Sequence, residues 1–566
     1  MSPAKARSAR VTPIRPPDAL QVGRAALARG AWREAKRAFQ RSLAEREQPE
    51  ALEGLGLAAW WLDSADLVFK SRDRAYQLYR KRGDHVAAAR LAVWLAWDSG
   101  AFLGEMHVAN GWLQRARTLL ANVPECPEHA WVAVREGIYA LLDDGDPAKA
   151  LERADTAIRI GREVGYIDGE MIGGALRGFA LVTAGNVQEG MRQLDEVNAA
   201  VLAGELNDPV AIALTCCYLV AACERVRDGK RALEWCRRLR EFCKDWGLKP
   251  LLAVCRTQYA SVCVWRGEWG EAEKELQRAT SELIASRPAM SGEGQARLGE
   301  LRRRQGRFDE ADALFENAGH HPIAALGRAA LALDRDDFRA AADLAERHLR
   351  TVSKLNRTER AAALEIVVRA RLALGGAEAA NAAAAELRSI ADDVGTPALT
   401  GSAMTASGLV AAHAGSVDQA CKALEDAADV FDKCDAPFEE ARVRIDLASL
   451  LARNGDRKLA LGEASSAVKT LNALDARHEA ARAQAVIDVL NAKADAPVKA
   501  GRGGLTAREI DVVRLVAKGH SNAQLARALS ISDHTVHRHI ANILLKLRVR
   551  SRSAIVGRAA AMGLLE

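Results

Sequence analysis

Residues 505–565 have the sequence LTAREIDVVRLVAKGHSNAQLARALSISDHTVHRHIANILLKLRVRSRSAIVGRAAAMGLL, in which helix-capping signals alternate with apolar runs. Thr506 and Glu509 form a Thr-x-x-Glu capping box, where each side chain satisfies a backbone N–H that the helix leaves unpaired. Gly519 can adopt the left-handed conformation that ends such a helix. A last helix is expected at about residues 552–562. The stretch therefore predicts four short helices.

The second and third of these helices are separated by a very short turn. Ser521 and Gln524 form another capping box, and Ser532 can cap a third helix that runs to about Leu547. Only residues 530–532 lie between the two helices. Two helices joined so tightly form a helix-turn-helix, whose second helix enters the major groove of DNA in DNA-binding proteins.

The third helix has two different faces at 100° per residue. The face expected to pack on the first two helices carries Val536, Ile540, Ile543 and Leu547. The opposite face carries His534, His537, Arg538, Ala541 and Leu545, with Thr535 and Asn542 at its edge and His539 and Lys546 between the faces. Arg538 is the best candidate for base readout, because a guanidinium can contact guanine O6 and N7 together. Ala541 is small enough to touch a thymine methyl.

Positive charge is concentrated in the same segment. Residues 505–566 hold ten Lys and Arg against four Asp and Glu, a net charge of +6, which equals the formal charge of the whole chain. Residues 1–504 are therefore neutral overall, and residues 18–498 carry a net −6. A small basic unit attached to a large, slightly acidic body is typical of a nucleic-acid-binding domain with a regulatory partner.

The C-terminal segment resembles the LuxR/FixJ-type DNA-binding domain. The matching residues are Leu505, Thr506, Arg508, Glu509, Gly519, Ser521, Asn522, Ile531, Ser532, Thr535, Val536, His539, Asn542, Ile543, Lys546, Leu547, Val549 and Arg552. His537 departs from the pattern, because the family often has Lys or Arg there. The base preference of the family is therefore not transferred to this position, and Arg538 can take over part of it.

This resemblance implies that the unit binds promoter DNA. It also implies that the fourth helix pairs two such domains into a homodimer, so the DNA site is expected to be an inverted repeat. RNA polymerase is a further candidate partner. The residues expected to contact DNA are Ser521, Asn522, Ser532, His534, Thr535, His537, Arg538, His539, Ala541, Asn542 and Lys546.

The body of the chain is internally repetitive. A Gly or Asp is followed five residues later by Ala at Gly30/Ala35, Gly145/Ala150, Gly267/Ala272, Gly306/Ala311, Asp336/Ala341, Gly375/Ala380, Gly415/Ala420 and Gly455/Ala460, and by Gly at Gly185/Gly190. From Gly267 onward the intervals are 39, 30, 39, 40 and 40 residues. A left-handed residue ends one helix, and a small residue lets the next helix pack closely.

One helix pair per repeat predicts an α-solenoid over residues 18–493. The pattern resembles tetratricopeptide repeats in a long variant, without most of the full consensus. About eleven to twelve helix pairs would fill residues 18–490. We expect an all-α fold in which the solenoid receives an unknown protein or small ligand and the C-terminal domain binds DNA.

The segments outside these two regions have a different composition. Residues 1–17 hold four basic residues, four prolines and no acid, so a disordered tail without a signal peptide is expected. Residues 494–504, ADAPVKAGRGG, have the composition of a flexible linker. No apolar stretch of 18 residues is apparent, so no membrane span is expected and the cytoplasm is the expected location.

Cysteine and tryptophan are unevenly distributed, and each pattern has two interpretations. Seven of the ten cysteines are Cys216, Cys217, Cys223, Cys236, Cys243, Cys255 and Cys263. Repeat spacing favours small buried residues, and a thiol redox sensor or metal centre is the alternative. All eleven tryptophans precede residue 270, with a dense group at Trp60, Trp61, Trp94, Trp97 and Trp112. Core filling is favoured over an aromatic-lined groove for a ligand.

Motifs for catalysis are missing from the sequence. It contains no phosphate-binding Gly-x-x-x-x-Gly-Lys-Ser/Thr, no receiver-like pattern, no Gly-x-Ser-x-Gly and no His-Glu-x-x-His. We therefore expect no catalytic, cofactor or metal site, and a transcriptional regulator rather than an enzyme. The alternatives are an interaction scaffold with accessory DNA binding and a thiol-based redox sensor.

Overall fold

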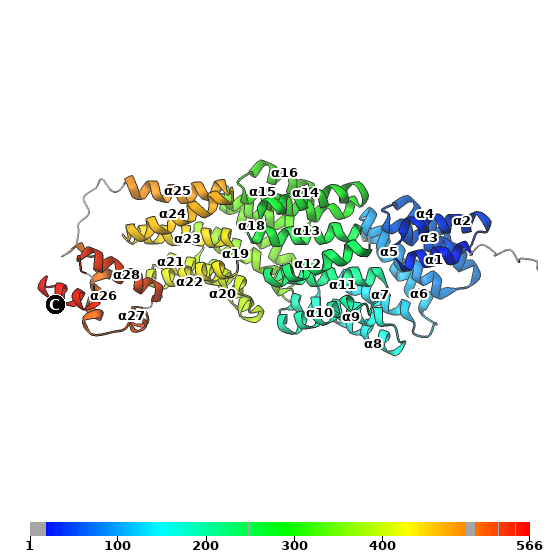
Figure 1. Ribbon diagram of the computed structural model, residues 1–566, viewed down its shortest axis with the longest axis horizontal. Coiled ribbons are helices and arrows are strands. Elements are labelled where there is room, and N and C mark those ends of the chain that lie inside the picture. The colour runs from blue at the N-terminus through cyan, green and yellow to red at the C-terminus, as the bar shows by residue number, and fades with distance from the viewer. Residues whose placement is uncertain are drawn as a thin grey trace, which may run out of the picture. The chain divides into compact units, whose positions relative to one another are not determined.

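The computed structural model describes residues 18–246, 249–492, 504–529, 531, 533–549 and 551–565, with some side chains inside these ranges left out. The described residues form helices joined by short turns, and no strand occurs among them. The expected all-α fold is confirmed (Figure 1). The predicted tail at 1–17 and nearly all of the predicted linker at 494–504 lie outside the described residues, so both remain predictions.

The chain divides into two compact units, and each is described by itself. Unit 1 comprises residues 1–132, 241–252 and 286–289. Its helices are α1 Ala19–Ala28, α2 Trp32–Glu45, α3 Pro49–Trp61, α4 Ala65–Arg82, α5 His85–Asp98, the single-turn π-helix η1 Ser99–Leu103, and α6 Met106–Leu120, followed by the first residues of α7 Pro127–Leu142. Consecutive helices of this unit pack against one another.

Tryptophans fill the interior of unit 1. Trp32 stacks on Trp61 with ring centroids 5.1 Å apart, and Trp60 meets Trp61 edge-on at 4.8 Å. The buried guanidinium of Arg72 lies 4.4 Å from the ring centroid of Trp94 and pairs with buried Asp98 at 2.6 Å. Trp32, Trp60 and Trp61 are all buried. The structure therefore confirms core filling for these three residues.

The expectation that the chain has no apolar stretch of 18 residues is wrong for one segment of unit 1. His85–Leu103, which joins α5 to η1, is long and apolar enough to cross a membrane by length and composition alone. Within the structure 67% of its most apolar window is buried, and it carries Asp98 of the ion pair with Arg72. A buried core helix meets the same criterion of length and hydropathy, since both environments select apolar side chains.

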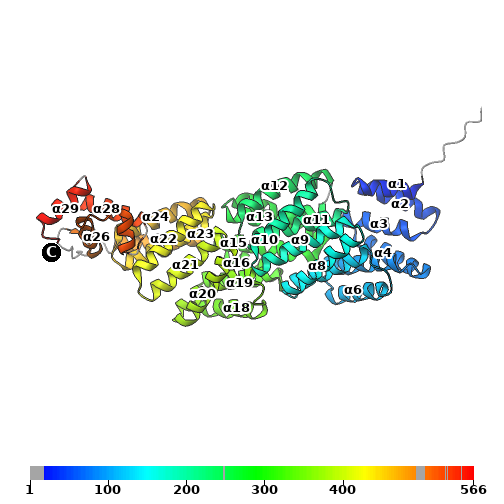
Figure 2. The same ribbon diagram turned by 90° about the horizontal axis from the view of Figure 1, so that it is seen from below.

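Unit 2 comprises residues 133–240, 253–285 and 290–566. Its repeat helices are α8 Pro147–Glu163, α9 Ile167–Ala184, α10 Val187–Leu202, α11 Pro209–Arg225, α12 Gly229–Trp246, α13 Lys249–Trp265, α14 Trp269–Ser286, α15 Ser291–Arg304, α16 Phe308–Asn317, α17 Pro322–Asp334, α18 Phe338–Thr351, α19 Arg357–Ala373, α20 Ala377–Val394, α21 Pro397–His413, α22 Val417–Lys433, α23 Pro437–Arg453, α24 Arg457–Ala473 and α25 Arg477–Ala492. They follow one another as antiparallel hairpins (Figure 2). The end of α12, the start of α13 and most of the 3₁₀ turn η2 Pro288–Met290 belong to unit 1.

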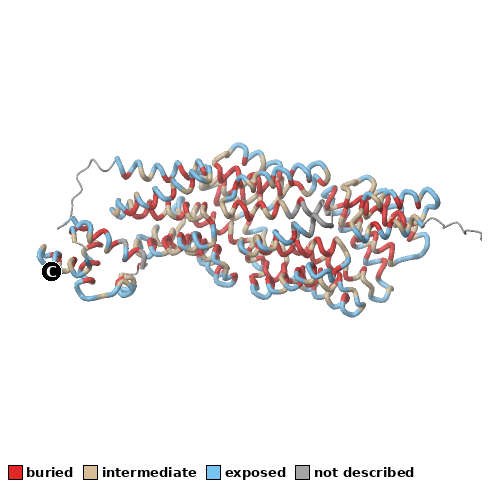
Figure 3. Tube along the Cα trace, viewed as in Figure 1, coloured by how far each residue is buried: buried red, intermediate tan, exposed pale blue. Residues whose placement is uncertain are grey.

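The repeat motif has the conformation that its residues predict. All nine anchor positions, from Gly30 to Gly455 and including Asp336, have positive φ between 59° and 99°. The alanines five residues later are fully buried. Figure 3 shows buried positions recurring along the successive helices. These hairpins are tetratricopeptide-like repeats.

Several odd-numbered helices of unit 2 pack on the next odd-numbered helix as well as on their hairpin partner, as α19 does with α20 and α21. Unit 2 also brings together helices that are far apart in sequence. One core cluster joins Trp269 and Leu276 of α14 to Phe438 of α23 and Leu471 of α24. Helix α9 likewise packs on α19. The array therefore winds back on itself, and the inner helices of distant repeats share a core.

Candidate nucleic-acid interface

The C-terminal segment of unit 2 contains the four predicted helices. They are α26 Ala507–Ala517, α27 Asn522–Leu529, α28 Asp533–Lys546 and α29 Arg552–Ala561. Thr506 and Glu509 form the predicted capping box, with Thr506 Oγ1 accepting from the Glu509 N–H at 3.2 Å and Glu509 Oε2 accepting from the Thr506 N–H at 2.8 Å. Gly519 ends the first helix with φ of +83°.

The turn between α27 and α28 makes the helix-turn-helix. Ser521 and Gln524 exchange the two hydrogen bonds of the second capping box, at 2.8 and 3.3 Å. The Ile531 N–H donates to the carbonyl of Ala526 at 3.0 Å, and buried Ile531 fixes the turn against the domain core. Ser532, predicted to cap α28, lies outside the described residues.

The apolar face of α28 is the core of the small domain. Val536 and Ile543 are fully buried, Leu547 is nearly so, and Ile540 packs against them from a partly buried position. Their partners include Val512 and Val513 of α26 and Leu525 of α27. The predicted inward face is confirmed, so the opposite face of α28 points away from the core.

That outward face contains part of the predicted DNA-contacting set. His537, Ala541 and Leu545 are exposed, and Leu545 retains 69% of its accessible surface. His534 and Arg538 lie on α28, but their side chains are outside the described set. Ser521 is exposed at the start of α27, and Asn522 is partly buried.

Three other predicted contact residues are buried. Thr535, His539 and Asn542 keep 5%, 4% and 9% of their accessible surface. Thr535 Oγ1 donates a hydrogen bond to a carboxylate oxygen of Glu425 in α22, which accounts for part of its burial.

Two arginines of the family-like pattern fix the helices of this domain. Arg508 donates to the carbonyl of Leu529 at 2.8 Å, at the end of α27, and pairs with Asp418 of α22 at 2.8 Å. Arg552 donates to the carbonyl of His520 and to the side chain of Asn522, at the start of α27. Both ends of α27 are thus held by guanidinium groups. The sequence analysis gave these residues as part of the family-like pattern and assigned them no structural role.

Lys546 has a structural partner that the sequence analysis missed. Its ammonium lies 2.5 Å from Oε2 of Glu509, whose side chain keeps 4% of its accessible surface. The carboxylate that closes the capping box of α26 is therefore neutralised from the end of α28. The sequence contained a signal for this ion pair. The capping box places Glu509 at the third position of the helix, and a buried glutamate needs a cation close by.

Six cations of the domain are exposed among the described residues. Exposed Lys and Arg side chains are Arg514, Lys518, Arg527, Lys546, Arg548 and Arg558. A small unit with six exposed cations attracts the phosphate backbone whatever the base sequence.

The cysteines that the structure describes fit the packing interpretation. Cys216, Cys223, Cys236 and Cys263 are buried in or beside α11–α13, while the side chains of Cys243 and Cys255 are outside the described set. Burial raises the pKa of Cys223 well above its ordinary value and that of Cys263 to about 12. A reactive thiol requires a lowered pKa. No group of three or more possible metal ligands occurs among the described residues.

Comparison with known proteins identifies the C-terminal domain. Residues 504–559 match the family model described as bacterial regulatory proteins, luxR family. The nitrate/nitrite response regulator protein NarP of Escherichia coli K12 is 56% identical over 50 residues, which are 9% of this chain and 23% of that protein. The response regulator protein VraR of Staphylococcus aureus is 46% identical over 52 residues, 9% of this chain and 25% of that protein. The C-terminal segment is a LuxR-family helix-turn-helix domain.

The chain spans about a quarter or less of the length of these relatives. Among solved structures, the Cut9–Hcn1 hetero-tetramer of the APC/C aligns with 82% of this chain at 12% identity and a TM-score of 0.35. A Rap protein complexed with competence and sporulation factor aligns with 59% at 11% identity and a TM-score of 0.38.

Proposed function

We propose that this protein is a DNA-binding transcriptional regulator in which the LuxR-family domain binds promoter DNA. The observation that carries the proposal is the geometry of α28. One face of this helix forms the core of the domain, and the other presents His537 and Ala541 beside the position of Arg538. A helix held in this way by a preceding helix and a tight turn can enter the major groove.

The role that we propose for each residue follows from its position in the domain. Arg538 reads a base edge, and Ala541 allows close approach. In this proposal Lys546, Ser521 and Asn522 contact the DNA backbone, together with the N-terminal end of α28. The other proposed contact residues are Ser532, His534, Thr535, His537, His539 and Asn542. Thr535, His539 and Asn542 require a local adjustment to reach DNA, because they are buried here.

We further propose that two copies bind one site. Pairing through α29 would relate two domains by a two-fold axis, so the site would be an inverted repeat. Exposed Arg558 and Ala560 of α29 leave a surface on which a second copy can pack. The repeats would receive a signal from a partner or ligand and pass it to the DNA-binding domain, and RNA polymerase is a candidate partner at the promoter.

The test is selection of duplexes from a random library by the full chain, followed by sequencing. The proposal predicts an inverted-repeat motif. Arg538→Ala is expected to cost roughly 1–3 kcal/mol in binding and to relax preference at one base pair in each half-site. The comparison variant is Arg527→Ala, an exposed cation of α27 that has no assigned role in base readout, so it should leave the selected motif unchanged.

Two outcomes would contradict these assignments. If the full chain enriches no duplex motif, the proposal of promoter binding is wrong. If Arg538→Ala changes neither the motif nor the affinity, Arg538 does not read a base.

A further inference from the structure

The DNA-binding domain contacts the repeats of unit 2 at helix α22. The Thr535 hydroxyl, in the first turn of α28, donates a hydrogen bond to the carboxylate of Glu425. Arg508, in the first turn of α26, pairs with Asp418 at 2.8 Å. The two acidic residues are seven positions apart on α22, so they lie on the same face of that helix. Thr535 and Glu425 keep 5% and 6% of their accessible surface, so water is largely excluded from their contact.

Charge favours this contact over a wider area than the two pairs. Helix α22 holds five Asp and Glu against two Lys, whereas residues 505–566 carry a net charge of +6. Burial raises the pKa of Asp456, the residue before α24, and the charges of Glu509, Lys546 and Arg508 also act on this carboxyl. A third acidic residue of the repeats therefore lies near the domain. Surfaces of opposite charge attract and orient each other.

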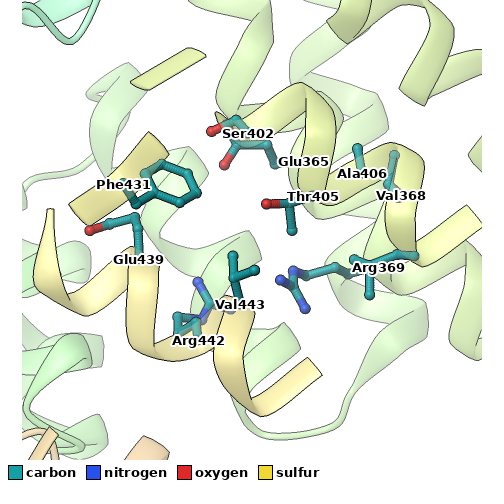
Figure 4. A pocket seen from close by; sticks show the side chains of 11 residues that line it. Glu365, Val368, Arg369, Ser402, Thr405, Ala406, Phe431, Glu439, Arg442 and Val443 are labelled. Atoms are coloured by element: carbon teal, nitrogen blue, oxygen red, sulfur yellow. The ribbon is translucent and has the colours of Figure 1, made fainter. Parts of the chain in front are cut away.

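The repeats that carry α22 have a fixed interior. Figure 4 shows side chains of α19, α21, α22 and α23 around a hollow, with Phe431 of α22 on its wall. The charged residues of this wall are all ion-paired, Glu365 with Arg227, Arg369 with Asp446, Glu439 with Arg304 and Arg442 with Glu479. Because these pairs connect the helices around α22, the acidic face of α22 is held by a rigid support.

Thr535 cannot serve α22 and DNA at the same time. It belongs to the proposed contact set, and the first turns of a recognition helix are the part that reaches the major groove. A carboxylate and a DNA phosphate both accept hydrogen bonds from a hydroxyl, so Glu425 competes with DNA for Thr535. Asp418 likewise neutralises Arg508, a cation that a phosphate would otherwise attract.

We propose that α22 inhibits DNA binding from within the chain, by holding the domain in a closed state through Glu425 and Asp418. The open state, in which both contacts are broken, is the one that binds DNA. The affinity of the full chain for DNA is then reduced by the fraction of molecules that are open. The inhibition rests on the proposed function, whereas the docking of the domain on α22 does not. Release from α22 is the adjustment that Thr535 needs to reach DNA.

The first experiment is fluorescence anisotropy of the full chain on a labelled duplex, with the wild type compared to the double variant Asp418→Ala/Glu425→Ala. The double substitution removes both partners of the domain on α22, so the Kd for the duplex should fall by roughly fivefold or more. Asp418→Ala alone changes a half-exposed residue and should lower the Kd by a smaller factor.

The matched control is Asp429→Ala/Asp432→Ala, which removes the same two charges from exposed positions of the same helix. Its Kd should stay within about twofold of the wild-type value, because exposed charges outside the contact contribute little. Circular dichroism of all variants shows whether the repeats remain folded.

Hydrogen–deuterium exchange of the full chain without DNA tests the docking alone. Amides of α28 should exchange faster in Asp418→Ala/Glu425→Ala than in the wild type or the control, because the closed state protects them. This measurement does not depend on the proposed function.

Three results would overturn the inference. Unchanged exchange in α28 would show that the domain does not dock on α22. An equal Kd for the wild type and the double variant would show that docking does not inhibit, and an equal fall in the Kd of the control would show an effect of net charge alone. If no variant binds any duplex, the proposed function is wrong, and the exchange rates still decide whether the domain docks.

Discussion

Lys546 lies at the end of α28, and its ammonium reaches back to the first helix of the same domain. It is 2.5 Å from Glu509 Oε2, which also accepts from the Thr506 N–H at 2.8 Å. A buried carboxylate with one backbone donor and one cation depends strongly on the cation. Lys546 therefore stabilises the domain, whether or not it also contacts DNA.

We expect Lys546→Met to lower the free energy of unfolding of the C-terminal domain by about 1–3 kcal/mol, because the buried Glu509 carboxylate loses its counter-charge. The measurement is urea denaturation of residues 504–566, followed by circular dichroism. Lys518→Met removes the same charge from an exposed position and should change stability much less. Equal stability of the two variants would show that the ion pair contributes nothing.

Capping and turn residues could be predicted from the sequence because their partners lie within a few positions. Thr506, Gly519 and Ser521 all adopt the roles that local chemistry assigns them. The ion pair of Lys546 with Glu509 spans 37 residues, and the hydrogen bond of Arg508 spans 21 residues. Such contacts depend on how helices pack, so sequence periodicity could not supply them.

At the scale of the element, one face of α28 packs in the domain core and the other forms the proposed recognition surface. Its inward residues pack on Val512, Val513 and Leu525, and this packing also positions the residues of the outward face. A change on the inward face should therefore act on folding first and on DNA binding only as a consequence.

Val536→Asp places a carboxylate at a fully buried position of α28. An unpaired buried charge costs several kcal/mol, so the small domain should unfold while the repeats keep their helices. Limited proteolysis and circular dichroism of the full chain would show loss of the C-terminal domain alone. The comparison variant is Ala541→Asp on the exposed face, which should fold normally. A Val536→Asp domain that resists protease like the wild type would show that the helix faces are assigned wrongly.

The repeat elements were predictable for the same local reason. A left-handed residue followed five positions later by a small buried one marks each hairpin, and Gly415 with Ala420 is an example. The packing of α14 on α23 and α24 could not be predicted. It joins segments more than 150 residues apart, and the period of a repeat gives no information on how tightly the array winds.

At the scale of the whole molecule, carboxylates paired with arginine stabilise unit 2, both within a helix and between helices. Burial alone would raise the pKa of Glu300, but Arg303 and Arg304 outweigh it and lower that pKa to about 2. Glu479 and Asp446 also have lowered pKa values, since nearby guanidinium groups outweigh their burial. The stability that these groups supply is present above the ordinary carboxyl pKa and is lost as pH falls through the lowered values.

We expect the thermal midpoint of the repeats to fall steeply as pH drops from about 4.5 toward 2. Glu300→Gln removes one contributor, worth at most about 3 kcal/mol, so its midpoint should lie below that of the wild type at pH 6 and approach it at pH 3. Scanning calorimetry across this range measures the difference. Glu378→Gln, at the exposed start of α20, should follow the wild type throughout. If Glu300→Gln lowers the thermal midpoint by the same amount at pH 3 and pH 6, the substitution acts through packing and not through the lost charge.

The central claim is that the C-terminal domain binds duplex DNA through its cationic surface and α28. It is tested most directly by fluorescence anisotropy of the full chain and of residues 504–566 on a labelled duplex between 50 and 200 mM salt. Each phosphate neutralised by Lys or Arg contributes about −0.9 to the slope of log affinity against log salt. With several exposed cations at the surface, we predict a slope of about −3 or steeper for both proteins. A slope near zero, or no binding at 50 mM salt, would contradict the account.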